Sequence, residues 1–142
     1  MKLFKHMTDG GKDSVVHGYW LIEWKALFSI VLLVFEDGSR EAYHSHAFNC
    51  FSWVLRGQLF EKHLDGRCNF ISPSWLPFGT YRNTFHKVSS KGRTYVLSFR
   101  GRWAKDWQEY LPQTNEIVHL TTGRIETNRY TYSGSRRDYI KY

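Results

Sequence analysis

The sequence has little cysteine, little proline and no long apolar run. Two cysteines, Cys50 and Cys68, are too few for a disulfide framework, so we expect a reducing, cytoplasmic setting in which one optional bridge stays open. The longest apolar stretch, residues 26–35, is about ten residues long and too short to cross a bilayer, which predicts no membrane insertion. Residues 1–11 lack the apolar core of a signal peptide, so none is expected.

What the chain does contain is enough apolar material for one packed core. Of its 142 residues, 42% are hydrophobic and 18% aromatic, which argues against disorder. This length leaves little room for a second core. The formal charge is +7, from 20 Lys and Arg against 13 Asp and Glu. We therefore expect one compact, basic domain.

Apolar runs alternate with turn signals along most of the sequence. Runs at residues 19–24 and 28–35, rich in aromatic and β-branched side chains, predict two strands. Further short runs follow about every eight to twelve residues, separated by Gly, Asp-Gly and Pro signals. This spacing predicts an all-β fold, a small antiparallel β-barrel or jelly roll. Residues 103–110 are the best candidate for a short helix.

The pattern divides the chain into three parts. Residues 1–14 form a short N-terminal lead-in, and residues 15–112 form the barrel. Residues 113–142 form a basic extension rich in Tyr and Arg. This extension is expected to wrap on the barrel, to pair with another subunit or to stay loose, and the sequence leaves the three alternatives open.

Three histidines carry the clearest chemical signal. His44 and His46 alternate on a predicted strand, so both imidazoles point to the same side. His86 lies one predicted hairpin later, where an antiparallel barrel can bring it beside the first two. Neutral imidazoles held on a rigid sheet suit a divalent transition-metal ion. The alternative is a polar strand with ordinary histidines.

The same region resembles the cupin superfamily. The first cupin motif, HxH, three or four residues, Glu, six residues and Gly, reads here as His44-Ser45-His46, three residues, Cys50, six residues and Gly57. The second, P-x-G followed by His, reads as Pro77-Phe78-Gly79 and then His86, with six intervening residues instead of the usual two. The stretches HSHAFN, FSWVLRG and YVLSFRGRWAKDW further resemble short single-domain cupin-like proteins of phages and bacteria.

The resemblance implies a cupin-type barrel that holds iron, manganese, nickel or zinc on His44, His46 and His86. Cys50 stands where the family's Glu ligand usually sits, so three histidines with open coordination positions remain, and Cys50 becomes a candidate catalytic residue. Open positions would polarise an oxygen, bind dioxygen or lower the pKa of a bound water. Thiol dioxygenases of the superfamily are similar in having three His and this Cys, but here the spacing from His46 to Cys50 is one residue shorter.

Two further residues alternate on the strand that follows Gly57. Glu61 and His63 are expected to share the inward face of this strand. Glu61 is a candidate acid/base or fourth ligand, and His63 is a candidate ligand-binding residue. A solvated strand face of mixed charge is the alternative for both.

A strip of seven basic residues without an acid runs from residue 82 to residue 105. It predicts a positively charged entrance beside His86 that binds a carboxylate, phosphate or nucleotide. Arg82, Lys87 and Arg100 are the candidate ligand-binding residues. A solvated charged face is the alternative. The strip and the Tyr/Arg-rich extension also permit nucleic-acid binding, although no RRM, KH, zinc-finger or helix-turn-helix pattern is present.

These observations lead to one hypothesis and two alternatives. The hypothesis is a metal-binding cupin-like protein that acts on or captures a small anionic molecule, by a dioxygenase-type or other metal-assisted reaction if it is an enzyme. The first alternative is a non-catalytic binder of a nucleotide-like or sugar-like ligand, as in a phage protein that sequesters a host metabolite. The second is a nucleic-acid or protein interaction module. A homodimer is also expected, because cupin-like barrels often pair through edge strands.

Overall fold

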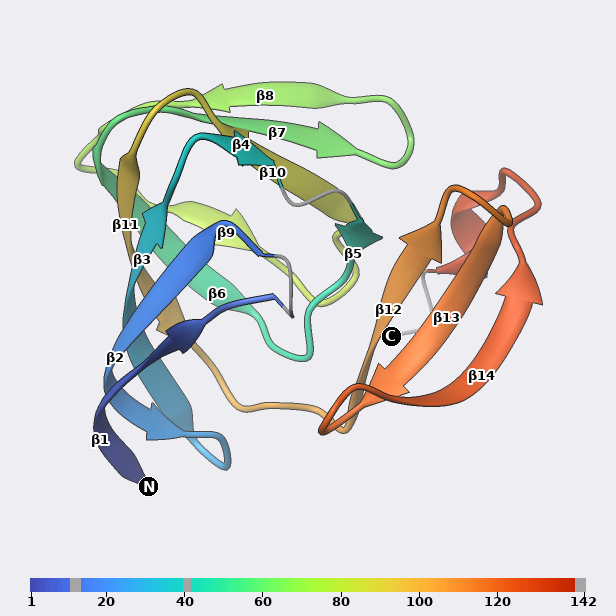
Figure 1. Cartoon of the computed structure of the whole chain (residues 1–142), viewed down its shortest axis with the longest axis horizontal. Helices are drawn as coiled ribbons and strands as arrows, with labels where there is room; N and C mark the ends of the chain where they lie inside the picture. The colour runs from blue at the N-terminus through green and yellow to red at the C-terminus, as the bar shows by residue number, and fades with distance from the viewer. Residues whose placement is uncertain (11–13, 40–41, 140–142) are drawn as a thin grey trace.

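The computed structural model describes residues 1–10, 14–39 and 42–139, and within these ranges the strands form two antiparallel sheets (Figure 1). The six-stranded sheet contains, in spatial order, β1 (Lys2–Thr8), β2 (Val16–Trp24), β3 (Phe28–Phe35), β11 (Thr94–Arg100), β6 (Cys50–Arg56) and β9 (Phe78–Thr80). The other sheet contains β14 (Ile125–Thr131), β13 (Glu116–Thr121), β12 (Asp106–Leu111), β5 (Tyr43–His44), β10 (His86–Ser90), β7 (Leu59–His63) and β8 (Cys68–Ile71), with β4 (Gly38–Ser39) beside β10. The predicted all-β jelly roll is confirmed. The described residues contain no helix of the length and hydropathy needed to cross a membrane.

The core of the barrel follows from the alternation of side chains along its strands. In β2 and β11, every second side chain points inward, as in Val16 and Trp20 or Thr94 and Val96. The indole of Trp20 requires a glycine at position 18, because a Cβ atom on Gly18 would lie only 2.3 Å from the Cζ3 atom of this indole. The strands predicted at residues 19–24 and 28–35 are confirmed as β2 and β3.

The segment predicted as a short helix, residues 103–110, is not helical. Most of it forms β12, which pairs with β13 on one side and with β5 on the other. Gln108 and Glu109, in the middle of this strand, are 0% and 6% exposed. A helix of two turns is marginal by itself, whereas the two neighbouring strands satisfy the backbone of this segment from both sides.

The Tyr/Arg-rich region is ordered over residues 113–139 and extends the second sheet. β13 and β14 continue from β12, and the 3-10 helix η1 (Arg136–Asp138) follows them (Figure 1). A separate cluster of buried residues lies here, made of Phe85, Ile117 and Tyr139. The region therefore covers one end of the second sheet instead of staying loose.

The strand expected to carry both His44 and His46 is shorter than predicted. β5 ends at His44, so His46 lies beyond it, and residues 40–41, just before β5, lie outside the described residues. After β5, the backbone N–H of Ser45 donates to the carbonyl of Gln108 at 2.9 Å, and the N–H of Gln108 donates to Ser45 Oγ at 2.9 Å. These two bonds fix the loop that carries His46 against β12.

Candidate metal centre

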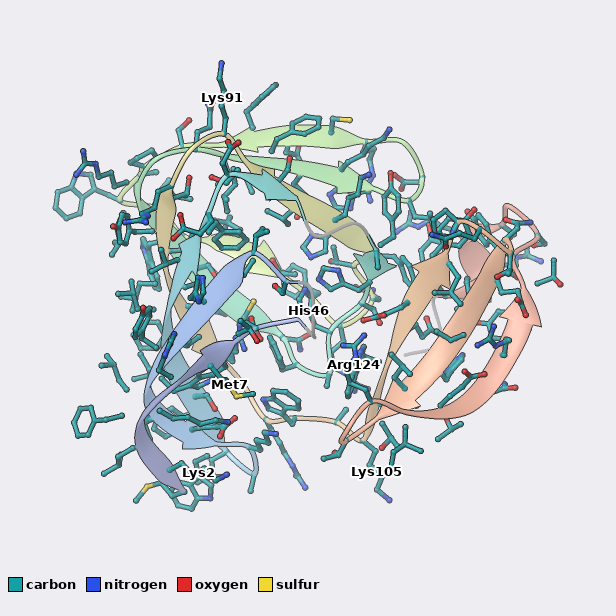
Figure 2. All side chains as sticks on the ribbon, in the orientation of Figure 1. Lys2, Met7, His46, Lys91, Lys105 and Arg124 are labelled. Atoms are coloured by element: carbon teal, nitrogen blue, oxygen red, sulfur yellow. The ribbon has the colours of Figure 1, made fainter. Side chains whose placement is uncertain are left out.

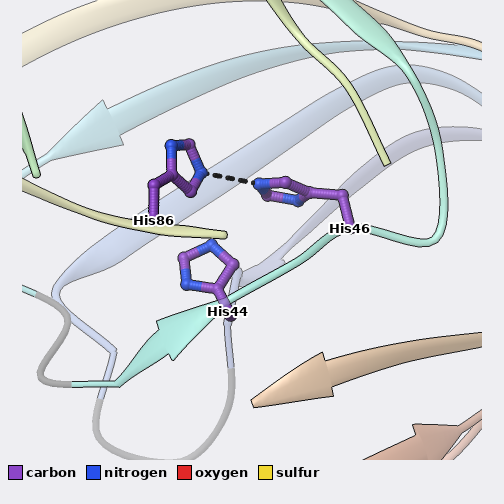
Figure 3. Close-up of side chains that lie close together, drawn as sticks. All are labelled: His44, His46 and His86. Atoms are coloured by element: carbon purple, nitrogen blue, oxygen red, sulfur yellow. Dashed lines mark hydrogen bonds between the residues drawn. The ribbon is translucent and has the colours of Figure 1, made fainter. Parts of the chain in front are cut away.

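Three imidazoles from three places in the fold meet between the two sheets. His44 ends β5, His46 lies in the following loop and His86 begins β10 (Figure 3). One ring nitrogen from each lies within 4.8 Å of the others. His44 and His86 are also register partners in adjacent strands, and they are 6% and 3% exposed. The structure thus brings together the three residues that were predicted as metal ligands.

Hydrogen bonds orient two of these rings. His86 Nδ1–H donates to Glu61 Oε2 at 2.6 Å, which leaves Nε2 free of a proton and directed at the other histidines. His44 Nδ1–H donates to the carbonyl of Ala42 at 3.2 Å and leaves its Nε2 free of a proton in the same way. This is the arrangement that histidine ligands usually have in metal sites, where the second nitrogen is held by a carboxylate or a carbonyl.

The donor set fits a divalent transition-metal ion. His46 Nε2 and His86 Nε2 lie 2.9 Å apart (Figure 3). Two nitrogens that bind one ion at about 2.1 Å and at right angles would be about 3 Å apart, so this pair is spaced for a shared ion. Three imidazoles without a thiolate or a carboxylate suit iron, manganese, nickel or zinc.

Glu61 and His63 lie side by side behind His86. His63 Nε2–H donates to Glu61 Oε1 at 2.9 Å, and Asn69 Nδ2 donates to the same oxygen at 3.0 Å. Burial alone would raise the pKa of Glu61, but the hydrogen bonds that it accepts from His86 and Asn69 outweigh burial, and its pKa is lowered to about 2. Neither Glu61 nor His63 lines either of the two cavities that the three histidines reach. Glu61 therefore contacts the ring of His86 and not the space in front of it.

Cys50 occupies a different position from the three histidines. It is 7% exposed and lies in the wall of an inner cavity of about 90 Å³ that the three histidines also reach. The ring nitrogens of the histidines converge without its sulfur, which accepts a hydrogen bond from Ser52 Oγ at 3.9 Å. Much of this inner cavity is apolar, with Leu33 and Val96 in its wall.

A larger cavity of about 410 Å³ opens on the other side of His44 and His46. Aromatic side chains form part of its wall, namely Trp20, Phe48, Trp103 and Trp107. Three basic side chains reach it from three segments, namely Lys5, Lys25 and Arg124, together with two acidic ones, Asp9 and Glu23. In Figure 2, Met7 and Arg124 flank His46 at this opening. This volume is in the range of cavities that hold small-molecule ligands.

The basic side chains of this cavity were not singled out by their sequence pattern. Lys5 Nζ lies 3.0 Å from Glu23 Oε2, and Lys25 Nζ lies 4.3 Å from the centre of the Trp103 ring. Arg124 has a φ of 60° in the turn between β13 and β14, and its Nη2 donates to both carboxylate oxygens of Glu109, at 2.7 and 2.8 Å. The φ value is visible only in the structure; in the sequence, Gly123 indicates a turn and does not mark Arg124 as a residue of the cavity.

The basic strip does not converge on the histidines. Of its seven residues, Arg100 alone lines either of the two cavities beside the histidines, and its Nη2 donates to Asp9 Oδ2 at 2.7 Å. Arg82 lies 3.9 Å from Asp106 Oδ1, and Lys87 Nζ lies 5.1 Å from the centre of the Tyr43 ring. Lys91 and Lys105 lie at opposite ends of the molecule (Figure 2). The four candidate ligand-binding residues, Arg82, Lys87, Arg100 and His63, are thus not brought together.

A double-sheet β-barrel with three histidines converging between its sheets is the architecture of the cupin fold. Comparison with solved structures leads to the same fold. A sugar phosphate isomerase of the cupin superfamily from Silicibacter pomeroyi is similar with a TM-score of 0.62 and 14% identity over 95% of each chain. An RmlC-like cupin from Shewanella frigidimarina has a TM-score of 0.54 and 15% identity, over 69% of this chain and 83% of that one.

A third similar structure, FeII HppE, has a TM-score of 0.56 and 14% identity, over 68% of this chain and 55% of that one. These likenesses show that the chain has the cupin fold. No protein-family model and no curated protein matches the sequence.

Proposed function

We propose that this protein binds one divalent transition-metal ion, iron, manganese, nickel or zinc, on His44, His46 and His86. We further propose that it acts on or captures a small anionic molecule in the cavity of about 410 Å³ beside them. The observation that supports this most directly is the convergence of three ring nitrogens within 4.8 Å, two of them on rings held by hydrogen bonds from behind.

The roles of the protein side chains follow from their contacts. A three-His ion supplies a Lewis acid with open coordination positions. Glu61 holds the ring of His86 and keeps the proton on Nδ1, so we assign it a positioning role instead of acid–base chemistry on a ligand. Cys50 lies in the wall of the inner cavity and contributes to its shape. If the protein is an enzyme, the reaction takes place where the two cavities meet at His44 and His46.

The anionic character of the ligand rests on the charges around the larger cavity. Lys5, Lys25 and Arg124 outnumber Asp9 and Glu23 there, and three neutral imidazoles leave a divalent ion its full charge. The tryptophans provide a flat apolar surface for the rest of the molecule. A similar structure that covers nearly the whole chain is that of a sugar phosphate isomerase, so phosphorylated sugars are the first class of ligand to test.

Metal analysis of the purified protein tests this proposal. We expect about one ion per chain after incubation with Fe²⁺, Mn²⁺, Ni²⁺ or Zn²⁺ and removal of excess metal, and loss of that ion in His86→Ala. His119→Ala is a matched control, because His119 contacts Gln108 and Tyr130 and lies outside the convergent group. Wild-type protein that retains none of the four ions contradicts the proposal.

The ligand is tested separately with glucose 6-phosphate, glucose and AMP as thermal-shift probes, with and without Mn²⁺. A larger stabilisation by glucose 6-phosphate than by glucose, and larger still with Mn²⁺, supports a site shared by ion and anion. Stabilisation by AMP without any effect of metal would favour the non-catalytic nucleotide binder instead.

A further inference from the structure

The outer face of the six-stranded sheet is apolar. On β6, Phe51 and Leu55 are 51% and 54% exposed, and on β11, Phe99 is 41% exposed. The register places these strands side by side, with Phe99 opposite Phe51 and Leu97 opposite Trp53. An antiparallel sheet with one face in the core normally turns polar side chains outward. Such a wide apolar surface is typical of a face that another protein covers.

A fully exposed tryptophan stands beside this face. Trp75 lies in the loop between β8 and β9, and 99% of its side chain is exposed, next to Leu76 at 78%. The loop is anchored, since Trp53 Nε1 donates to the carbonyl of Trp75 at 3.1 Å. The exposed ring is therefore presented by a backbone that is tied to the sheet.

A groove of about 580 Å³ adjoins Trp75 on the same surface. Its wall includes Trp53, Leu55, Leu97 and Phe99 from the sheet and Pro73 and Trp75 itself from the loop, and all the residues that line it are uncharged. Trp53 and Phe99 meet edge to face, with ring centroids 5.6 Å apart. The groove is thus an aromatic and aliphatic slot of a size that receives a large side chain.

We propose that two copies of this chain associate through this face, with Trp75 of each copy in the groove of the other. A surface that carries both a protruding side chain and a matching slot is self-complementary, which is the condition for a closed two-fold dimer. The charge of the chain is consistent with this contact. Each copy carries +7, so two copies repel each other where charged surfaces meet. The groove has no charged lining residue, so contact through it avoids this repulsion. The contact uses the face of the sheet and not its edge strands.

The exposed area is sufficient for such a dimer. Trp75, Phe51 and Phe99 together expose roughly 400 Å², taking about 150–250 Å² for a whole aromatic side chain. Four further side chains roughly double this exposed area: Tyr19, Leu21 and Leu55 on the face, each about half exposed, and Leu76 in the loop, which is 78% exposed. A standard interface buries about 800 Å² on each partner.

Sedimentation velocity over a range of protein concentrations tests the proposal. We expect a dimer at micromolar concentration, and for Trp75→Ala a dissociation constant raised at least about 100-fold, because two buried tryptophan anchors are lost in each dimer. Phe70→Ala is the control, since Phe70 is 73% exposed on β8, in the other sheet, and its removal should leave the dimer unchanged. A wild-type monomer at hundreds of micromolar would overturn the proposal and assign the face to a different partner.

A mixing experiment tests the reciprocal geometry. In homodimers of Trp75→Ala both grooves stay empty, and in homodimers of Phe99→Lys both grooves are blocked. Mixing the two variants creates a heterodimer in which Trp75 of the Phe99→Lys chain faces the groove of the Trp75→Ala chain. That groove lacks its own Trp75 but keeps Trp53, Leu55, Leu97 and Phe99. Statistical mixing of equal amounts already gives about twice as much heterodimer as either homodimer. Native mass spectrometry should therefore show the heterodimer in much more than twofold excess over either homodimer, and the statistical ratio would overturn the proposed pairing. Circular dichroism confirms that both variants are folded, and Trp75→Ala removes only a side chain outside the core.

Discussion

The substitution Glu61→Gln tests how the three-histidine site is held in place. Glu61 accepts on both carboxylate oxygens, from His86 on one and from His63 and Asn69 on the other. Glutamine has one acceptor oxygen and one NH₂ group, so it cannot accept on both sides. If its oxygen faces His63 and Asn69, its NH₂ faces His86 Nδ1 and drives the proton of that ring to Nε2. The nitrogen directed at the other histidines then becomes a donor and no longer binds metal.

The magnitude follows from the same contacts. Hydrogen bonds to charged groups contribute about 1.5–3 kcal/mol and neutral ones about 0.5–1.5, so loss of the charge alone costs roughly 1–1.5 kcal/mol, or about tenfold in affinity. The wrong ring tautomer adds to this loss. We therefore expect Glu61→Gln to weaken Zn²⁺ binding by about 10- to 100-fold, the range seen when such outer partners of metal ligands are removed. Glu61→Asp keeps the charge and should retain part of the affinity.

Competition with a chromophoric chelator for Zn²⁺ measures this loss directly. Glu126→Gln is the matched control: Glu126 is an exposed partner of Arg129 on β14, and its replacement should leave the affinity unchanged. Far-ultraviolet circular dichroism on each apo protein separates a weakened site from a damaged fold. A Glu61→Gln variant that binds Zn²⁺ within twofold of the wild type would refute the reasoning.

Three further substitutions follow from single contacts. Gly18→Ala forces the Trp20 indole out of place and should lower the free energy of unfolding by about 1–3 kcal/mol in urea titrations. Gly101→Ala is the control, because its added Cβ would meet its nearest neighbour at 3.4 Å. Equal effects of the two substitutions would contradict the steric explanation. Cys50→Ser should leave the metal content at its wild-type value by mass spectrometry, and loss of the ion would place the sulfur among the ligands. Arg124→Ala removes both hydrogen bonds to the buried carboxylate of Glu109 and should lower the free energy of unfolding by about 1–3 kcal/mol. Arg124→Lys should restore part of this loss. An unchanged denaturation midpoint would show that this pair contributes nothing to stability.

The barrel strands were predictable because their pattern is local. Residues 28–35 are apolar and β-branched enough to form a strand in almost any context, and Asp-Gly or Gly signals mark the turns that follow such runs. Residues 103–110 were predicted wrongly for the opposite reason. The burial of Gln108 and Glu109 comes from pairing with β13 on one side and, on the other, with β5, which lies far away in the sequence. No local pattern of two polar residues indicates a buried strand.

The convergence of the histidines was predictable, but the surroundings of the site were not. His44, His46 and His86 lie in motifs with a characteristic spacing, so their meeting followed from a resemblance to one fold. The strip from residue 82 to residue 105 was contiguous in sequence, but only Lys87 and Arg100 of its members lie on strands, β10 and β11, which belong to different sheets. The other members lie in the loops before, between and after these strands. The larger cavity instead draws Lys5, Lys25 and Arg124 from distant segments, and each is recognisable only once the sheets are packed.

The charge balance of the proposed site follows from Cys50 standing where a cupin usually has a carboxylate ligand. Three neutral imidazoles leave a divalent ion its full charge, and the carboxylate of Glu61 lies behind His86, where it is already bonded to His86, His63 and Asn69. On the proposed function, an anionic ligand supplies the missing negative charge, and the cavity that would receive it is lined by Lys5, Lys25 and Arg124. Ion and anion should then strengthen each other by the same factor, since binding free energies are reciprocal. A neutral analogue of the same shape lacks the charge that the ion requires, and it should gain no affinity when the metal is added.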